Sequence, residues 1–119
     1  MELELKNKIA LVTGSSKGIG KEIANTLLNE GCKVILNGRD KKSLEKTSKS
    51  FNPPTKFIIA DVTKPFECKK LIEKTIQLYG SLDIVVCNVG DGKSVAPGKE
   101  TIADWNKMFE ANLQSATNV

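Results

Sequence analysis

The segment that most constrains the fold is a turn with three glycines at a fixed spacing, near the start of the chain. Residues 13–20 have the sequence TGSSKGIG. The run before it, residues 8–13, is continuously apolar at its centre and predicts a fully buried strand. Residues 18–30 then place Ile19, Ile23 and Leu27 four positions apart, which predicts one apolar face of a helix. The chain therefore begins with a strand, a glycine turn and a helix.

Each glycine of this turn has a mechanical explanation. Gly14 permits the tight exit from the strand, Gly18 lets the backbone approach a pyrophosphate, and Gly20 lets helix and strand pack closely. The N-terminus of the helix supplies free N–H groups and a partial positive charge for phosphates. The position of the turn between a buried strand and an amphipathic helix disfavours the alternative of an ordinary glycine turn. We predict that a dinucleotide is bound here by Gly14, Ser15, Ser16, Lys17, Gly18, Ile19 and Gly20.

The rest of the chain repeats the alternation of strand and helix. Strands are expected at 33–36, 56–60 and 82–87, and helices at 41–50, at 65–79 and from a capping-box pattern at 101–104 onwards. Short connections between such elements force parallel strands and right-handed crossovers. We therefore predict an α/β fold, an open, doubly wound parallel sheet that is Rossmann-like and incomplete, with about four strands. Residue 119 falls within a helical pattern, so we interpret 1–119 as the N-terminal part of a single truncated domain.

Composition argues against several other classes of protein. Eighteen basic and fourteen acidic residues give a net charge of +4, but the lysines are scattered, so no nucleic-acid surface is expected. No stretch approaches the ~20 apolar residues of a membrane span, and the N-terminus lacks the pattern of a secretory signal. The sequence has three widely spaced cysteines and no histidine, so neither a metal site nor a disulfide framework is expected. These features favour a reduced, cytoplasmic setting.

The spacing T-G-x-x-x-G-x-G, together with three later landmarks, resembles the short-chain dehydrogenase/reductase family. Asp61 and Val62, at the end of the third strand, resemble the pair that contacts the adenine in that family. Asn88 and Gly90 match positions of the N-N-A-G motif after the fourth strand, and Asn112 resembles the helix asparagine of the catalytic tetrad. The resemblance covers nearly the whole chain and is closest to the 3-oxoacyl-carrier-protein reductase type.

Two residues depart from that pattern. Cys87 and Val89 stand where the N-N-A-G motif has asparagine and alanine, so the correspondence there rests on Asn88 and Gly90. We expect the bulkier Val89 to tighten the loop beside the nicotinamide ribose.

The end of the second strand, 37–39, bears on which cofactor is bound. An NAD site needs a carboxylate here to accept hydrogen bonds from the ribose 2′-OH. Arg39 would instead bind a 2′-phosphate through a charge-assisted pair, and Lys17 could add a second cation. We therefore predict NADP, with Asn37 and Arg39 among the residues of its site, as the resemblance also implies. The alternative is that Arg39 is a solvated turn residue and Asp40 binds the ribose.

The chemistry that the resemblance implies needs residues that this sequence does not contain. Hydride transfer in the family uses a serine and a Tyr-x-x-x-Lys pair, whereas Tyr79 is the single tyrosine and is followed four positions later by Asp83. One interpretation is an NADP-dependent oxidoreductase for a carbonyl or alcohol substrate, truncated and inactive as this chain. The other is a non-catalytic nucleotide-binding or interaction module. An end within a helix favours the first, and a natural stop codon after residue 119 would favour the second.

The last predicted helix carries an apolar face formed by Trp105, Met108, Phe109 and Leu113. This face and the free edge of the fourth strand would both be exposed in a chain of this length. In the resembled family this helix builds a subunit interface. We therefore expect self-association, with a homo-oligomer as the functional form.

Overall fold

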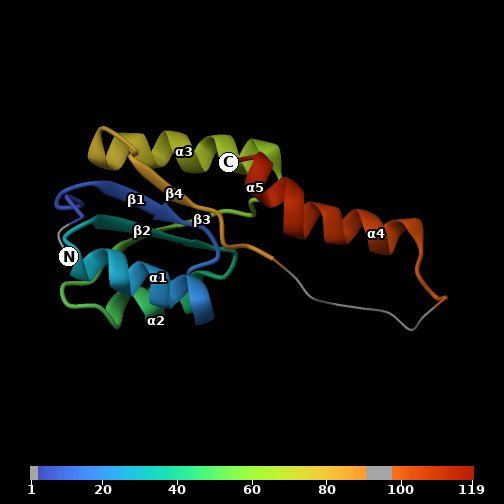
Figure 1. Cartoon of the computed structure of the whole chain (residues 1–119), viewed down its shortest axis with the longest axis horizontal. Helices are drawn as coiled ribbons and strands as arrows, with labels where there is room; N and C mark the ends of the chain where they lie inside the picture. The colour runs from blue at the N-terminus through green and yellow to red at the C-terminus, as the bar shows by residue number, and fades with distance from the viewer. Residues whose placement is uncertain (1–2, 91–97) are drawn as a thin grey trace.

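The computed structural model describes residues 3–90 and 98–119 (Figure 1). Residues 91–97, which follow the Asn88 and Gly90 positions of the N-N-A-G motif, lie outside the described residues. Four parallel strands form one sheet in the order β3-β2-β1-β4. The strands are β1 (Ile9–Val12), β2 (Lys33–Gly38), β3 (Lys56–Ile59) and β4 (Ile84–Val86).

Helices cover both faces of this sheet. Figure 1 shows α1 and α2 on one face and α3 on the other, with α4 extending away from the sheet. The helices are α1 (Gly18–Asn29), α2 (Lys41–Lys49), α3 (Pro65–Tyr79), α4 (Ile102–Phe109) and α5 (Ser115–Thr117), and a π-helical turn, η1 (Glu110–Gln114), joins α4 to α5. The predicted α/β fold with a doubly wound, parallel, four-stranded sheet is therefore confirmed.

The core consists of two clusters, one on each side of the sheet, because successive side chains of a strand point to opposite faces. In β1, Ala10 and Val12 pack toward α1 and α2, whereas Leu11 packs toward α3. All four residues of β1 are buried, as a central parallel strand covered on both faces requires. The continuous apolar run at the start of the chain is thus explained by its place in the middle of the sheet.

β2 and β4 end at other residues than expected because of the strands with which they pair. β2 extends to Gly38 because Asn37 and Gly38 pair with Ile58 and Ile59 of β3. β4 is shorter than predicted because it is an edge strand, which pairs with β1 alone among the described residues and only over residues 84–86.

Ile19 lies on the predicted apolar face of α1, but the core does not cover it. Its side chain is 74% exposed, whereas Ala24 is fully buried and Ile23 and Leu27 pack against the core. Ile19, Ile23 and Leu27 line one groove together with residues of α2, so the three share one side of the helix. The part of this apolar face that the core covers begins one turn later than the periodicity suggests.

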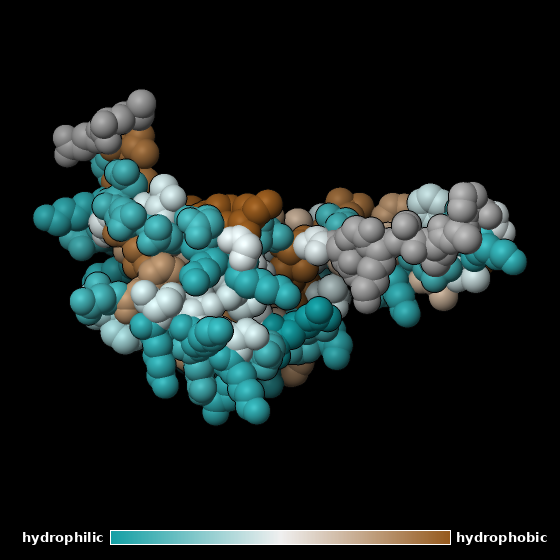
Figure 2. Space-filling model, turned by 90° about the horizontal axis from the view of Figure 1, so that it is seen from below, coloured by the Kyte–Doolittle hydropathy of each residue, from teal (hydrophilic) through white to brown (hydrophobic). Residues whose placement is uncertain are grey.

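The exposed apolar face expected on the last helix is present. Trp105, Phe109 and Leu113 are each more than half exposed, and Ile102 is 81% exposed. The ring centroids of Trp105 and Phe109 lie 6.4 Å apart, so the two side chains form one continuous apolar surface. Val85 of the edge strand is also exposed. The face over α1 and α2, seen from below in Figure 2, carries many hydrophilic side chains with apolar areas between them. No helix among residues 3–90 and 98–119 has the length and apolar character needed to cross a membrane.

Candidate functional site

The glycine turn connects β1 to α1 with two residues in the left-handed region. Gly14 has φ of 60° and Gly18 has φ of 61°, values that side chains disfavour. Gly20 has an ordinary φ, but a Cβ there would lie 2.2 Å from the carbonyl oxygen of Gly14 and 2.6 Å from Nδ2 of Asn88. The third glycine therefore permits close contact between the helix, the turn and the loop after β4.

The N-terminus of α1 differs from those of α2 and α4. Its N-cap residue, Lys17, is extended and makes no side-chain capping hydrogen bond within the described part of the chain, and its first turn has no acidic residue. α2 is instead capped by Asp40, and α4 begins with a capping box formed by Thr101 and Asp104. The first N–H groups of a helix have no intrahelical acceptor. Those of α1 are thus suited to an anionic ligand.

Ser15 and Asn37 hold the turn from the side that faces the core, and both are buried. The Ser15 N–H donates to the Asn37 carbonyl at 2.8 Å, and the Asn37 N–H donates to Ser15 Oγ at 2.9 Å. The Asn37 amide also donates to the carbonyls of Ile58 and Ala60, at 3.1 and 3.3 Å. Both side chains therefore support the turn from within the core, and the contact of these two residues with a cofactor stays a prediction.

Ser16 and Lys17 occupy the part of the turn that solvent reaches. The Ser16 carbonyl accepts a hydrogen bond from Thr47 Oγ1, which connects α2 to the turn. Lys17, Gly18 and Ile19 are exposed. These predicted contact residues therefore lie together at an open surface.

The loop after β4 is joined to the glycine turn by Asn88. Its N–H donates to Thr13 Oγ1, and its Nδ2 donates to the Gly14 carbonyl, both at 3.1 Å. Thr13 also donates its N–H to the Val86 carbonyl at 3.0 Å. Hydrogen bonds thus join the ends of β1 and β4, which are far apart in the sequence.

Asn112 approaches the same loop from the C-terminal helices. A Cβ on Gly90 would lie 2.9 Å from Asn112 Oδ1, so the glycine permits this close approach. Asn112 Nδ2 donates to the Met108 carbonyl at 3.0 Å. Asn112 lies in the π-helical turn η1, a widened turn that no feature of the sequence had suggested. Such turns are frequent at functional sites. Ser115, just beyond it, is buried and donates to the Ala111 carbonyl at 2.6 Å.

Asp61 and Val62 follow β3 at the same edge of the sheet. Asp61 Oδ1 accepts hydrogen bonds from the N–H and the hydroxyl of Thr63, at 3.0 and 2.6 Å. Partial burial acts to raise the pKa of the Asp61 carboxyl, but these hydrogen bonds and the positive charges of Arg39 and Lys64 outweigh it, and the pKa is lowered. The Val62 side chain is buried in the cluster that faces α3. Val62 can therefore offer a ligand its backbone, and Asp61 a charged carboxylate.

Arg39 is exposed immediately after β2, close enough for its charge to act on Asp61. The neighbouring carboxylate of Asp40 is used within the protein. Its Oδ1 accepts from the Lys42 N–H at 3.1 Å and its Oδ2 accepts from the Ser43 hydroxyl at 2.7 Å. The Ser43 hydrogen bond is the main reason that the pKa of Asp40 is lowered. Each oxygen of Asp40 thus accepts one of these hydrogen bonds as the residue caps α2.

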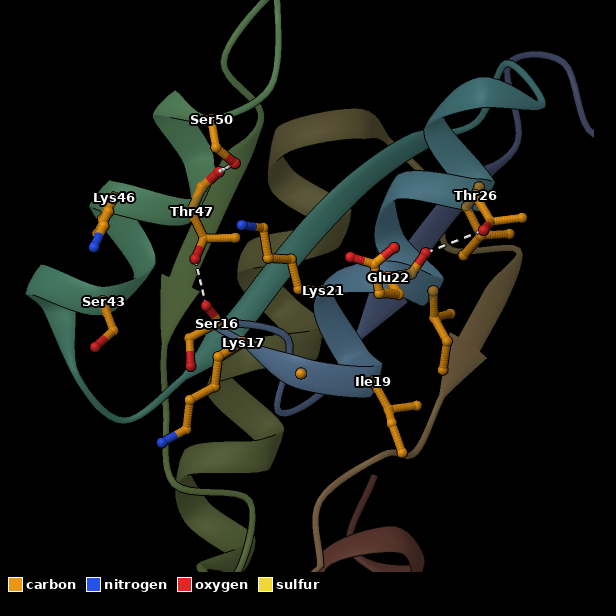
Figure 3. Close-up of a pocket in the computed structure, with 13 residues that line it drawn as sticks. Ser16, Lys17, Ile19, Lys21, Glu22, Thr26, Ser43, Lys46, Thr47 and Ser50 are labelled. Carbon is orange, nitrogen blue, oxygen red and sulfur yellow. Dashed lines mark hydrogen bonds between the residues drawn. The ribbon is translucent and has the colours of Figure 1, made fainter.

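A groove of about 1080 Å³ runs between α1 and α2 (Figure 3). It meets the glycine turn at one end, where Ser16, Lys17, Gly18 and Ile19 line it, and continues between the helices past Lys21 and Lys46. Arg39, Asp61, Asn88 and Gly90 do not line it. The groove therefore includes four of the predicted site residues and leaves out those that follow β2, β3 and β4. Among the described residues, no group of three or more acidic, cysteine or histidine side chains could hold a metal ion.

The family model described as short chain dehydrogenase matches residues 8–119. The chain belongs to the short chain dehydrogenase family. An uncharacterized oxidoreductase of Staphylococcus saprophyticus is 38% identical over 116 residues, covering 94% of this chain and 50% of that protein. An uncharacterized oxidoreductase of Bacillus subtilis is 37% identical over 118 residues, covering 98% of this chain and 44% of that protein. The chain spans about half the length of the curated relatives it matches.

Two solved structures have the same fold. The complex of Pseudomonas aeruginosa RhlG with NADP superposes with a TM-score of 0.89 at 31% identity, over 96% of this chain and 45% of that one. A short chain dehydrogenase from Mycobacterium smegmatis gives a TM-score of 0.91 at 28% identity, over 96% of this chain and 50% of that one. The glycine turn and the loops after β3 and β4 thus belong to a short chain dehydrogenase framework.

Proposed function

We propose that this chain is the NADP-binding half of a short chain dehydrogenase whose full-length form transfers hydride between NADP(H) and a carbonyl or alcohol substrate. The observation that carries this proposal is the N-terminus of α1. It has no side-chain cap among the described residues, and it follows a turn with two glycines in the left-handed region. A pyrophosphate placed there would accept hydrogen bonds from the free N–H groups and would be favoured by the helix dipole.

The surroundings of Arg39 support NADP rather than NAD. Arg39 is exposed at the end of β2, and Lys17 lies in the adjacent turn, so a 2′-phosphate would meet two cations. Asp40, the other candidate for the ribose, is engaged as the N-cap of α2. A 31% identical structural relative is a complex with NADP, which agrees with this preference.

The loops after β3 and β4 complete the proposed site. Asp61 and the backbone of Val62 would contact the adenine, and Asn88 and Gly90 would lie beside the nicotinamide ribose. Asn112, next to Gly90, is the residue of the family's catalytic set that this chain contributes. The Tyr-x-x-x-Lys pair does not occur in the 119 residues, so we expect cofactor binding without turnover from this chain.

A titration with reduced cofactors tests the proposal. The 119-residue chain should enhance nicotinamide fluorescence of NADPH at lower concentrations than that of NADH, because a charge-assisted contact to the 2′-phosphate is worth ~1.5–3 kcal/mol. Adenosine 2′,5′-bisphosphate should displace NADPH, and adenosine 5′-monophosphate should do so less well. Failure to bind either dinucleotide would refute the nucleotide-binding role, and equal affinities would refute the preference for NADP.

A further inference from the structure

Asn37 connects three strand ends from inside the protein. Its side chain is 1% exposed, and its amide donates to the carbonyls of Ile58 and Ala60 at 3.1 and 3.3 Å. Its backbone exchanges two hydrogen bonds with Ser15, through the N–H of each residue. Ser15 Oγ donates in turn to the Val12 carbonyl at 2.7 Å. The hydrogen bonds thus run without a break from the end of β1, through the end of β2, to the end of β3.

The two ends of this network lie beneath two different parts of the proposed nucleotide site. Ser15 belongs to the glycine turn, which would hold the pyrophosphate. Ala60 immediately precedes Asp61, whose own N–H donates to Glu67 Oε1 at 3.1 Å. The backbone at the adenine end is therefore held on one side by Asn37 and on the other by α3. A fully bonded buried polar network is rigid, because each member lacks an alternative partner.

We propose that Asn37 is a positioning residue that sets the spacing between the glycine turn and the Asp61–Val62 backbone. This inference rests on the proposed nucleotide-binding function. The adenine and the pyrophosphate are parts of one rigidly spaced ligand, so both ends must be in place together for tight binding. Asn37 does not reach the surface where a 2′-phosphate would lie. Its loss should therefore weaken NADPH and NADH by the same factor, unlike the loss of a residue that selects the phosphate.

The variant that tests this role is Asn37→Asp, which keeps the size of the side chain and removes its donor group. A carboxylate oxygen would then face the carbonyls of Ile58 and Ala60, and the span between the strand ends should loosen. Ile58→Val is the matched control, because it perturbs the same place in β3 and keeps every hydrogen bond. Asn37→Ser is a milder variant for the case in which the aspartate prevents folding, since it leaves space for water at the two carbonyls.

Two measurements on the 119-residue chain test the positioning role of Asn37. The first is binding of NADPH and NADH by nicotinamide fluorescence, where we expect both affinities to fall by about tenfold in Asn37→Asp with their ratio preserved. The second is amide hydrogen exchange of the free protein, where the N–H groups of Ser15 and Ala60 should both exchange faster than in Ile58→Val.

A loss confined to NADPH would overturn the inference, because it would make Asn37 a phosphate-selecting residue, and unchanged affinity for both cofactors would overturn it as well. If the unmodified chain binds neither dinucleotide, the proposed nucleotide-binding function fails. The exchange measurement still tests whether Asn37 couples the backbone at Ser15 to the backbone at Ala60. Faster exchange at both Ser15 and Ala60 would then support the coupling of the two backbone segments. Faster exchange at Ala60 alone would contradict it.

Discussion

A side chain on Gly20 would place its Cβ 2.2 Å from the carbonyl oxygen of Gly14, far inside van der Waals contact. The first turn of α1 thus lies directly against the backbone that leaves β1. Asn88 closes the arrangement by donating from Nδ2 to the same carbonyl at 3.1 Å. The turn, the helix and the loop after β4 are therefore in mutual contact.

Replacing Gly20 with alanine should destabilise the protein. In an ordinary helix interior this change stabilises by ~1 kcal/mol, but here the clash is with backbone that cannot move away, and we expect a loss of about 2–4 kcal/mol. Urea unfolding followed by circular dichroism measures the change. Gly18→Ala is the control, since a Cβ there meets no described atom within 4 Å and the cost of its positive φ is ~1–2 kcal/mol. A Gly20→Ala variant as stable as the parent would show that the close contact is absent.

Replacing Arg39 with alanine should weaken NADPH binding by roughly ten- to a hundredfold and leave NADH binding nearly unchanged. The reason is that the guanidinium would contact only the 2′-phosphate, which NADH lacks. Fluorescence titration of both cofactors at constant ionic strength measures the effect. Lys49→Ala, at the far end of α2, controls for the loss of one positive charge. Equal weakening of both cofactors would refute the assignment.

The Asp61 carboxylate should contribute stability that is lost in acid. Its pKa is lowered in the folded protein, despite partial burial, by hydrogen bonds from Thr63 and by neighbouring positive charges. A carboxyl whose pKa is lower in the folded state binds protons more tightly in the unfolded state. Its contribution to the free energy of unfolding is therefore fully present above its unfolded pKa, near 4, and is lost as the pH falls through its folded pKa. Asp61→Asn should therefore be less stable than the parent near neutral pH, and the difference should shrink below about pH 4. Urea midpoints measured across this range test it, with Glu73→Gln on α3 as the control. A difference that is independent of pH would contradict the argument.

The apolar face of α4 should drive self-association. Trp105 and Phe109 are 58% and 52% exposed and their rings adjoin, which is the kind of surface that usually marks an interface. Phe109→Glu should shift sedimentation at high protein concentration toward the monomer. Lys107→Glu, on the same helix, changes charge without removing apolar area and should have a smaller effect. A parent chain that sediments as a monomer throughout would refute the prediction of a homo-oligomer.

Local features of the site were predictable from the sequence because neighbouring residues determine them. The capping box of Thr101 and Asp104 forms as its pattern predicts, with both reciprocal hydrogen bonds present. Gly31 and Gly80 take positive φ after α1 and α3, as expected of glycines that end helices. The alternation of apolar runs and amphipathic segments was likewise sufficient for the parallel sheet, because short connections leave few other topologies.

The roles of several site residues required the arrangement of the strands. The sequence places Ser15 in the turn and Asn37 at a strand end, and the pairing of β2 with β3 puts the Asn37 amide inside the core. Ile19 fits a helical apolar face by spacing, yet the core does not cover it and it is exposed. Asn112 is brought beside Gly90 through a π-helical turn that leaves no recognisable trace in composition or periodicity.

By itself, the sequence determined the strand–turn–helix unit, the parallel α/β fold and the identity of the polar residues at the strand ends, because these depend on backbone freedom and on apolar periodicity over short distances. Only the tertiary structure decided which of those polar residues are exposed and which hold the turn in place. The physical reason is that a buried amide such as that of Asn37 must find hydrogen-bond partners, and its partners come from a strand about twenty residues away whose position is set by packing of the whole sheet.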